Sequence, residues 1–223
     1  MQTIIQATPK RPRFLKNLLY NLDHVDGIVY DDINSASGMV KVFEKCDRDV
    51  LVLQDDILPC KDFQKAADLI VKLLPDQIIS FFSAYDTETP LSKKKHWLVM
   101  DRLYGTLAYV MPLHLAKRYL EFNKVIKQRI YADDVRISMF MKHYKLNVFV
   151  TCPSLVEHLC WQTTSQSDNK VPPANFNYRV AKTYIGYENS ALDINWKRGL
   201  NSLHFLNIGN DFDFIRHYND NKI

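Results

Sequence analysis

Residues 51–59 of the sequence read Leu-Val-Leu-Gln-Asp-Asp-Ile-Leu-Pro. The apolar run from Val50 to Leu53 is typical of a strand that is buried on both faces of a parallel sheet. Two adjacent carboxylates, Asp55 and Asp56, follow at the carboxyl end of this strand. Because open α/β sheets bind their ligands at the carboxyl ends of their strands, the stretch predicts both a fold class and a place for a site.

The segments before residue 50 alternate between strand and helix patterns. Residues 3–7 and 27–30 are short β-rich runs, and helices are expected from Pro12 onward and at residues 35–45. This order predicts an α/β fold with a mostly parallel, Rossmann-like central sheet flanked by helices. Farther along, we expect helices at 63–74, 113–122 and 133–143, strands at 77–82, 103–111 and 147–151, and an exposed loop at 87–95.

Length, charge and cysteine usage narrow the class of protein. The 223 residues are enough for one substantial core, so we expect a single domain over residues 1–223. A net charge of +4 is too small to indicate nucleic-acid binding by itself. The N-terminal apolar run is short and soon followed by basic residues, which predicts neither a signal peptide nor a membrane anchor. The four cysteines lack zinc-site spacing, and we expect reduced thiols in a cytoplasmic protein.

The acid pair after the apolar strand suits a hard divalent cation. Asp55 and Asp56 offer oxygen ligands, and a bound diphosphate and water would complete the coordination shell. Such an ion would neutralise charge on a departing nucleoside diphosphate. The alternative is an acidic turn that caps the helix expected from about Asp62, and the pair by itself does not decide between the two.

Two later motifs add groups that could act on a substrate. Asp133 and Asp134 stand at the start of an expected helix, where Asp133 is well placed as an N-cap and Asp134 as a general base. His158 follows the expected strand at 147–151. A lone histidine is more often structural than a ligand, but His158 is a reasonable further contact for a metal or a diphosphate.

Five motifs in a fixed order resemble the GT-A glycosyltransferases, especially bacterial and viral relatives of the lipopolysaccharide-modifying group and the animal N-acetylglucosaminyltransferases. They are Gln54-Asp55-Asp56 with Pro59 and Asp62-Phe63, Gly105-Thr106-Leu107-Ala108-Tyr109, Asp133-Asp134, Pro153 to His158, and Arg179 to Gly186. One departure matters, because Gln54 replaces the first acid of the family's motif.

The resemblance implies a metal site that uses Mn²⁺ or Mg²⁺. In the family, the last acid of the motif meets the metal, which assigns Asp56 as a ligand with His158 beside it. Asp55 would contact the ribose or the waters of the metal. The loss of the first charge at Gln54 could weaken metal binding or make the metal dispensable.

The resemblance also implies where the nucleotide-sugar donor binds. Ala7, Thr8 and Arg11 would cradle the nucleotide, expected to be UDP, and Gly105 would lie on the donor side. Asp31 or Asp32 would reach the base or the ribose, although a solvated turn is an equal alternative for this pair. Residues 1–110 would then form the nucleotide-sugar-binding half, and residues 111–223 the acceptor half with a mobile loop at 162–175.

The expected activity is an inverting, metal-assisted hexosyl transfer with Asp134 as base, Asp133 beside it, and His158 assisting the leaving group. The acceptor is a saccharide or a hydroxymethylated base in phage DNA. The basic run at 93–95 is expected to be a solvated loop, and if it binds a ligand, that ligand is an anionic acceptor. A phage or bacterial source fits both acceptors. The alternatives are a metal-dependent nuclease or phosphatase and a non-catalytic nucleotide- or sugar-binding module.

Overall fold

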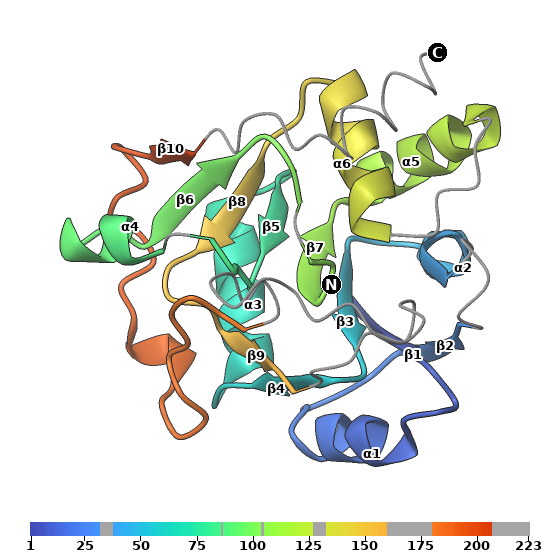
Figure 1. Ribbon diagram of the computed structural model, residues 1–223, viewed down its shortest axis with the longest axis horizontal. Coiled ribbons are helices and arrows are strands. Elements are labelled where there is room, and N and C mark those ends of the chain that lie inside the picture. Colours follow the sequence, from blue (N-terminus) through green and yellow to red (C-terminus); the bar gives the residue numbers. More distant parts are fainter. Residues whose placement is uncertain (32–37, 86, 104, 127–132, 160–179, 207–223) are drawn as a thin grey trace, which may run out of the picture.

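An eight-stranded mixed sheet forms the centre of the computed structural model (Figure 1). The structure describes residues 1–31, 38–85, 87–103, 105–126, 133–159 and 180–206. The strands of this sheet, in spatial order, are β10 (His204–Leu206), β6 (Trp97–Met100), β8 (Val148–Thr151), β5 (Ile78–Ser80), β7 (Ala108–Met111), β3 (Val50–Gln54), β1 (Gln2–Ala7) and β2 (Gly27–Tyr30).

Most strands of this sheet run in the same direction. The pairs β1–β2, β1–β3, β5–β8 and β6–β10 are parallel, whereas β3–β7, β5–β7 and β6–β8 are antiparallel. The predicted α/β fold with a mostly parallel central sheet flanked by helices is therefore confirmed. The expected division into a donor half and an acceptor half stays a prediction.

The strand order reverses between β1 and β3. The chain passes from β1 through α1 (Pro12–Tyr20) to β2, and then through α2 (Gly38–Lys45) to β3 on the other side of β1. Such a reversal of strand order opens a ligand-binding crevice at the carboxyl ends of the two strands. The crevice lies at the ends of Ala7 and Gln54, where the next residues of both strands are polar.

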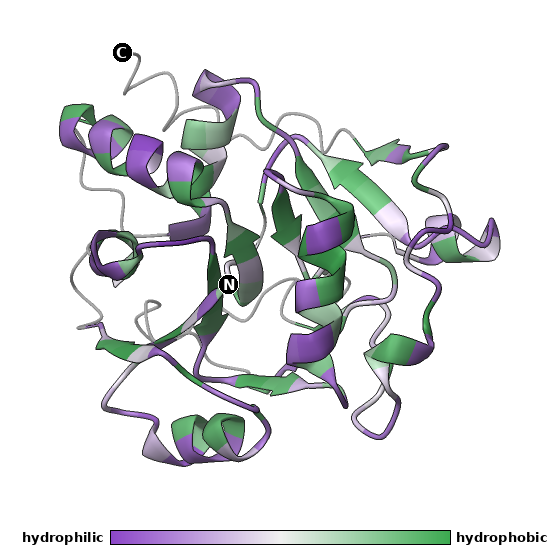
Figure 2. Cartoon of the chain, turned by 180° about the vertical axis from the view of Figure 1, so that it is seen from behind, coloured by the Kyte–Doolittle hydropathy of each residue, from purple (hydrophilic) through white to green (hydrophobic). Residues whose placement is uncertain are grey.

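Helices cover both faces of the sheet. One hydrophobic core contains Ile4 of β1 together with buried side chains of α2, α5 (Leu113–Val125) and α6 (Asp133–His143). The other contains Ile5 with side chains of α1 and α3 (Phe63–Leu73). Neighbouring residues of a strand point to opposite faces, so the alternation along β1 separates the two cores. Figure 2 shows apolar strands in the centre and polar stripes on the helices.

Several predicted elements need correction. The strand expected at 103–111 begins only at Ala108, and it lies antiparallel between β3 and β5. The apolar run before it forms the separate strand β6, and the positive φ of 71° at Gly105 belongs to the connection between them. The exposed loop expected at 87–95 contains the short helix α4 (Glu88–Ser92).

Four further short elements were not expected. The strands β4 (Ile57–Pro59) and β9 (Val156–His158) pair as a separate two-stranded ribbon directly after the acid pair. In the later segment, η1 (Ala191–Asp193) is a short 3₁₀ helix and β10 extends the sheet beside β6. Within the described ranges, no helix is long and apolar enough to cross a membrane.

Candidate active site at the carboxyl ends of β1 and β3

The acid pair is buried where β3 ends. Asp55 and Asp56 are 0% and 2% exposed, although both are charged side chains. The backbone N–H of Asp55 donates to the carbonyl of Gln6 over 3.1 Å, which continues the β1–β3 ladder past the end of β3. The backbone N–H of Thr8 donates to Asp55 Oδ2 over 2.8 Å. Backbone pairing between the two strands therefore fixes the position of the pair.

Arg11 bridges the two carboxylates. This residue directly precedes Pro12, the first residue of α1, so the β1–α1 turn carries its side chain to the end of β3. Arg11 Nη2 lies 2.7 Å from Asp55 Oδ1, and Nη1 contacts Asp56 Oδ2. A guanidinium that spans two buried carboxylates offsets much of the cost of burying their charge.

The ribbon β4–β9 brings His158 to the same place. Ile57 pairs with His158 across the ribbon, and the backbone N–H of Leu159 donates to the carbonyl of Asp56 over 2.8 Å. His158 Nε2 then lies 3.1 Å from Asp56 Oδ2. Residues that are 102 positions apart in the chain thereby form one cluster with Thr8, Arg11 and Asp55.

The two acids of the pair differ in pKa. Burial raises the pKa of Asp55 to about 6, although the hydrogen bond from Thr8 and the charge of Arg11 act in the opposite direction. Burial also acts to raise the pKa of Asp56, but the hydrogen bond from His158 and the charge of Arg11 outweigh it and lower this pKa. Asp56 therefore keeps its negative charge near neutral pH.

The residues at Asp56 fit a divalent cation only in part. In the described ranges, no group of three or more His, Cys, Asp or Glu side chains could hold a metal by itself. Asp56 Oδ1 is buried and has no hydrogen-bond partner among the described residues. Asp56 Oδ2 already contacts Arg11 Nη1 and lies 3.1 Å from His158 Nε2, so a cation held by Asp56 and His158 would replace their hydrogen bond. Two protein ligands would leave the remaining positions to a diphosphate and water.

A second polar cluster lies on the α2–α5–α6 side of β1. Gln6 Nε2 donates to Asp31 Oδ2 over 3.1 Å and to Asp133 Oδ2 over 2.9 Å. The backbone N–H of Asp31 donates to the carbonyl of Ala7 over 2.8 Å, which places the end of β2 beside the end of β1. The structure thus joins two predicted site residues, Asp31 and Asp133, through a glutamine that the sequence did not single out.

The two acids at the start of α6 differ in their surroundings. Asp133 takes part in the cluster with Gln6, and burial raises its pKa to about 6 despite that hydrogen bond. Asp134 Oδ1 instead accepts the backbone N–H of Val135 over 2.9 Å, a contact within the first turn of the helix. The predicted role of Asp133 as N-cap needs correction, because α6 includes Asp133 as its first residue.

Gln54 and Gly105 lie near the end of β3. Gln54 Nε2 donates to Thr106 Oγ1 over 3.1 Å, so the residue directly before the acid pair binds the connection that precedes β7. Gly105 has a φ of 71°, and a Cβ there would lie 3.3 Å from the ring of Phe82. The positive φ accounts for glycine at this position.

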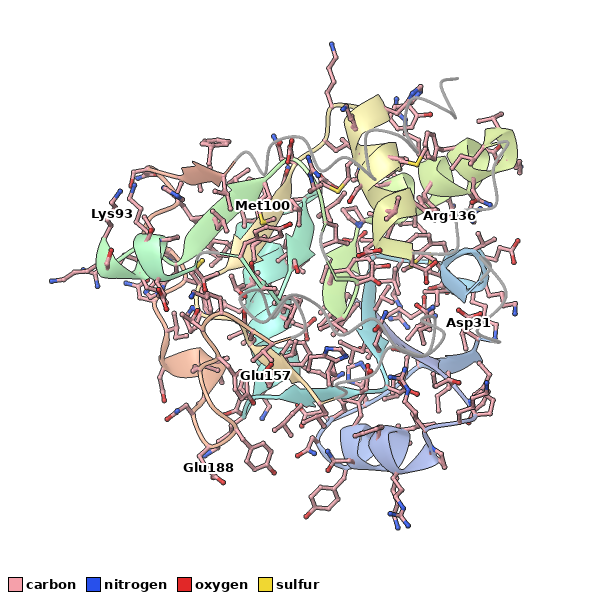
Figure 3. The ribbon with its side chains drawn as sticks, in the orientation of Figure 1. Asp31, Lys93, Met100, Arg136, Glu157 and Glu188 are labelled. Carbon is pink, nitrogen blue, oxygen red and sulfur yellow. The ribbon has the colours of Figure 1, made fainter. Side chains whose placement is uncertain are left out.

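Some predicted residues lie outside the described part of the chain, and some contributors were not predicted. Asp32 and the loop at 162–175 are outside the described ranges. Gln6 and Glu157 were missed, and Glu157 Oε1 accepts the backbone N–H groups of His158 and Ala181 (Figure 3). The available hint for Gln6 was a polar residue directly after the apolar pair Ile4-Ile5 in the first expected strand.

Comparisons with known proteins add little to this geometry. A scan against known protein families finds no match, and a search among curated proteins finds none either. Among solved structures, the chain is similar to the crystal structure of A197 from STIV, with 16% sequence identity and a TM-score of 0.44. That match covers 72% of this chain and 86% of the other. The interpretation of the site therefore depends on its own residues.

Proposed function

We propose that this chain is a glycosyltransferase that takes a sugar from a nucleotide-sugar donor. The observation that carries the proposal is the cluster of Thr8, Arg11, Asp55, Asp56 and His158 at the crevice between β1 and β3. A switch of strand order is where open α/β sheets bind nucleotides, and here it holds both acidic and basic groups. The order of motifs that resembles GT-A enzymes supports the same reading.

The charged groups of the cluster suit a diphosphate. Asp56 stays ionised and, with His158, would hold Mn²⁺ or Mg²⁺, which when bound would supply positive charge to the leaving nucleoside diphosphate. Arg11, which bridges Asp55 and Asp56, would supply a second positive charge to the bound diphosphate. Thr8 and Asp31, at the ends of β1 and β2, would bind the nucleoside together with Asp55 at the end of β3.

The reaction is a single in-line displacement with inversion. The acceptor oxygen forms a bond to the anomeric carbon, the bond from that carbon to the diphosphate oxygen breaks, and an aspartate at the start of α6 takes the hydroxyl proton. The nucleoside diphosphate leaves with the electron pair. The acceptor is a saccharide or a hydroxymethylated DNA base, and the donor is a UDP-sugar.

Calorimetric titration of nucleoside diphosphates, with and without Mn²⁺, tests this proposal. We expect Asp56→Asn to weaken Mn²⁺-dependent binding of one nucleotide at least tenfold, because it removes the ionised ligand. Asp62→Asn is the matched control, since Asp62 is an acid of the same stretch that contacts Lys65 and Ser190 instead. If the wild type binds no nucleoside diphosphate, or if both variants bind like the wild type, the proposal is wrong.

A further inference from the structure

A single amide group ties together two carboxylates from distant parts of the chain. Gln6 Nε2 lies 3.1 Å from Asp31 Oδ2 and 2.9 Å from Asp133 Oδ2. Gln6 is 8% exposed and belongs to β1, whereas Asp31 follows β2 and Asp133 begins α6. Carboxylates only accept hydrogen bonds when ionised, so the NH₂ group must face both of them.

The start of α2 leaves room for this arrangement because it is a glycine. A Cβ on Gly38 would come closer than 3.0 Å to both Asp31 Oδ2 and Gln6 Nε2. The first turn of the helix therefore packs directly on the contact between Gln6 and Asp31. Neither side chain could move toward α2, which limits the positions that the amide can take.

Several other ionisable groups surround Asp133. Asp31 and Asp134 act to raise its pKa, whereas Arg136 acts to lower it, and the phenols of Tyr109 and Tyr119 lie within electrostatic range. Arg136 Nη1 also donates to Asn123 Oδ1 over 2.7 Å, which holds that cation against α5. Figure 3 shows Arg136 and Asp31 on the same side of the molecule. The amide of Gln6 is thus the neutral member of a charged cluster.

Two acceptor atoms of this cluster have no donor among the described residues. Both Gln6 Oε1 and Asp133 Oδ1 are buried and make no hydrogen bond there. Buried acceptors in folded proteins nearly always receive a hydrogen bond. These two atoms are therefore suited to accept a hydrogen bond from the hydroxyl of a bound substrate. A sugar or a hydroxymethyl group offers such a hydroxyl.

We propose that Gln6 is a positioning residue that holds Asp133 by the same amide that binds Asp31, and that Asp133, rather than Asp134, takes the acceptor proton. This rests on the proposed glycosyl transfer. One oxygen of Asp133 is held by Gln6, and the other is left to accept a hydroxyl proton. Asp31 accepts a hydrogen bond from the same amide nitrogen. A nucleoside bound at Asp31 would therefore also affect the position of Asp133.

Titration of Asp133 by carbon NMR of its carboxyl group is the first experiment. We expect a midpoint near the pKa of about 6 in the wild type. Gln6→Met, of similar length but without the amide, should move it upward by about one pH unit through the lost hydrogen bond. Gln2→Met is the matched control in the same strand, because the Gln2 side chain accepts the backbone N–H of Asp47 and is not part of the cluster around Asp133. A midpoint that does not move in Gln6→Met overturns the positioning role.

A second variant covers the case in which Gln6→Met does not fold. Asp31→Asn keeps the shape of the side chain but removes its charge, which acts to raise the pKa of Asp133. The midpoint of Asp133 should then fall. An unchanged midpoint means that the two carboxylates are not coupled, and the proposal is wrong.

Kinetics separate the choice of base from the proposed function. With UDP-glucose and Mn²⁺, transfer to water should fall at least 100-fold in Asp133→Asn and less than tenfold in Asp134→Asn. The reverse result overturns the assignment of Asp133, although the glycosyltransferase proposal would stand. If no variant and no wild type acts on the donor, the proposed function fails, whereas the NMR result on Gln6 still decides the positioning role.

Discussion

Asp133 illustrates how a group suited to chemistry can weaken the fold at the scale of one residue. Its pKa is raised from 3.8 to about 6 by burial. Between these values the folded protein binds more protons than the unfolded chain, so stability falls as pH rises through this range. Above pH 6 the buried carboxylate is ionised in both states, and the cost of its burial is then complete.

Asp133→Asn should therefore stabilise the protein at neutral pH while removing the proposed base. We expect a gain in the free energy of unfolding on the order of 2 kcal/mol at pH 7 and almost none at pH 4. Urea unfolding at several pH values measures this difference. Asp134→Asn is the control, and an equal gain in that variant, or a gain for Asp133→Asn that does not depend on pH, contradicts the prediction.

At this scale the sequence predicted the acids better than their partners. Asp55 and Asp56 could be placed because a strand with a fully apolar run must end where its polar residues begin. Gln6 could not be found in this way, since its partners lie 25 and 127 positions away. Arg11 was expected near the nucleotide, but its bridge between Asp55 and Asp56 follows from the β1–α1 turn.

At the scale of elements, α2 packs closely on the ends of β1 and β2. Gly38→Ala would place a Cβ against Asp31 and Gln6, so helix or side chains must shift. We expect a loss of about 1–3 kcal/mol in the free energy of unfolding and an altered titration of Asp133. Gly27→Ala is the matched control, because nothing lies within 4 Å of a Cβ there. Equal stability of the two variants in urea unfolding would contradict this expectation.

The elements that the sequence predicted poorly are strands that are short or buried on both faces. The run before β7 gave no alternation to reveal where β6 ended or that β7 would be antiparallel. The ribbon β4–β9 consists of three residues per strand, and its register depends on contacts made across the chain. The start of α1 and the bounds of α3 and α6 were predicted to within a residue. For α1 and α3 the reason is that an amphipathic period is a local signal.

Across the whole molecule, the basic run Lys93, Lys94 and Lys95 lies at the same edge of the sheet as the site. Trp97, the first residue of β6, pairs with Thr151 at the carboxyl end of β8, so the residues before β6 belong to that edge. Four strand spacings of about 4.8 Å separate β6 from β3, about 19 Å in all. Figure 3 shows Lys93 on the far side of the molecule from Asp31. An extended anionic acceptor could reach both.

Salt dependence tells a DNA acceptor from a neutral saccharide. We expect Lys93→Gln with Lys94→Gln to weaken binding of a DNA duplex and to lower the slope of log affinity against log salt by about 1 to 2. The control is Lys142→Gln with Lys145→Gln, two lysines that are also exposed. Lys145 matches Lys94 in having a positive φ. Fluorescence anisotropy at several salt concentrations measures both pairs. If the slope of log affinity against log salt is the same for both variant pairs, the basic run does not contact DNA.

The sequence separation of the contacts in the site determines how late in translation the site can form. Arg11 meets Asp56 across 45 positions, His158 meets Asp56 across 102, and Gln6 meets Asp133 across 127. Long closures of this kind form late, because the chain loses entropy before the contacts compensate for it. A nascent chain on the ribosome cannot bring His158 to Asp56 until β9 has emerged and paired with β4. A ligand that needs the complete cluster can therefore bind only after the second half of the chain has folded, and it cannot guide the folding of the first half.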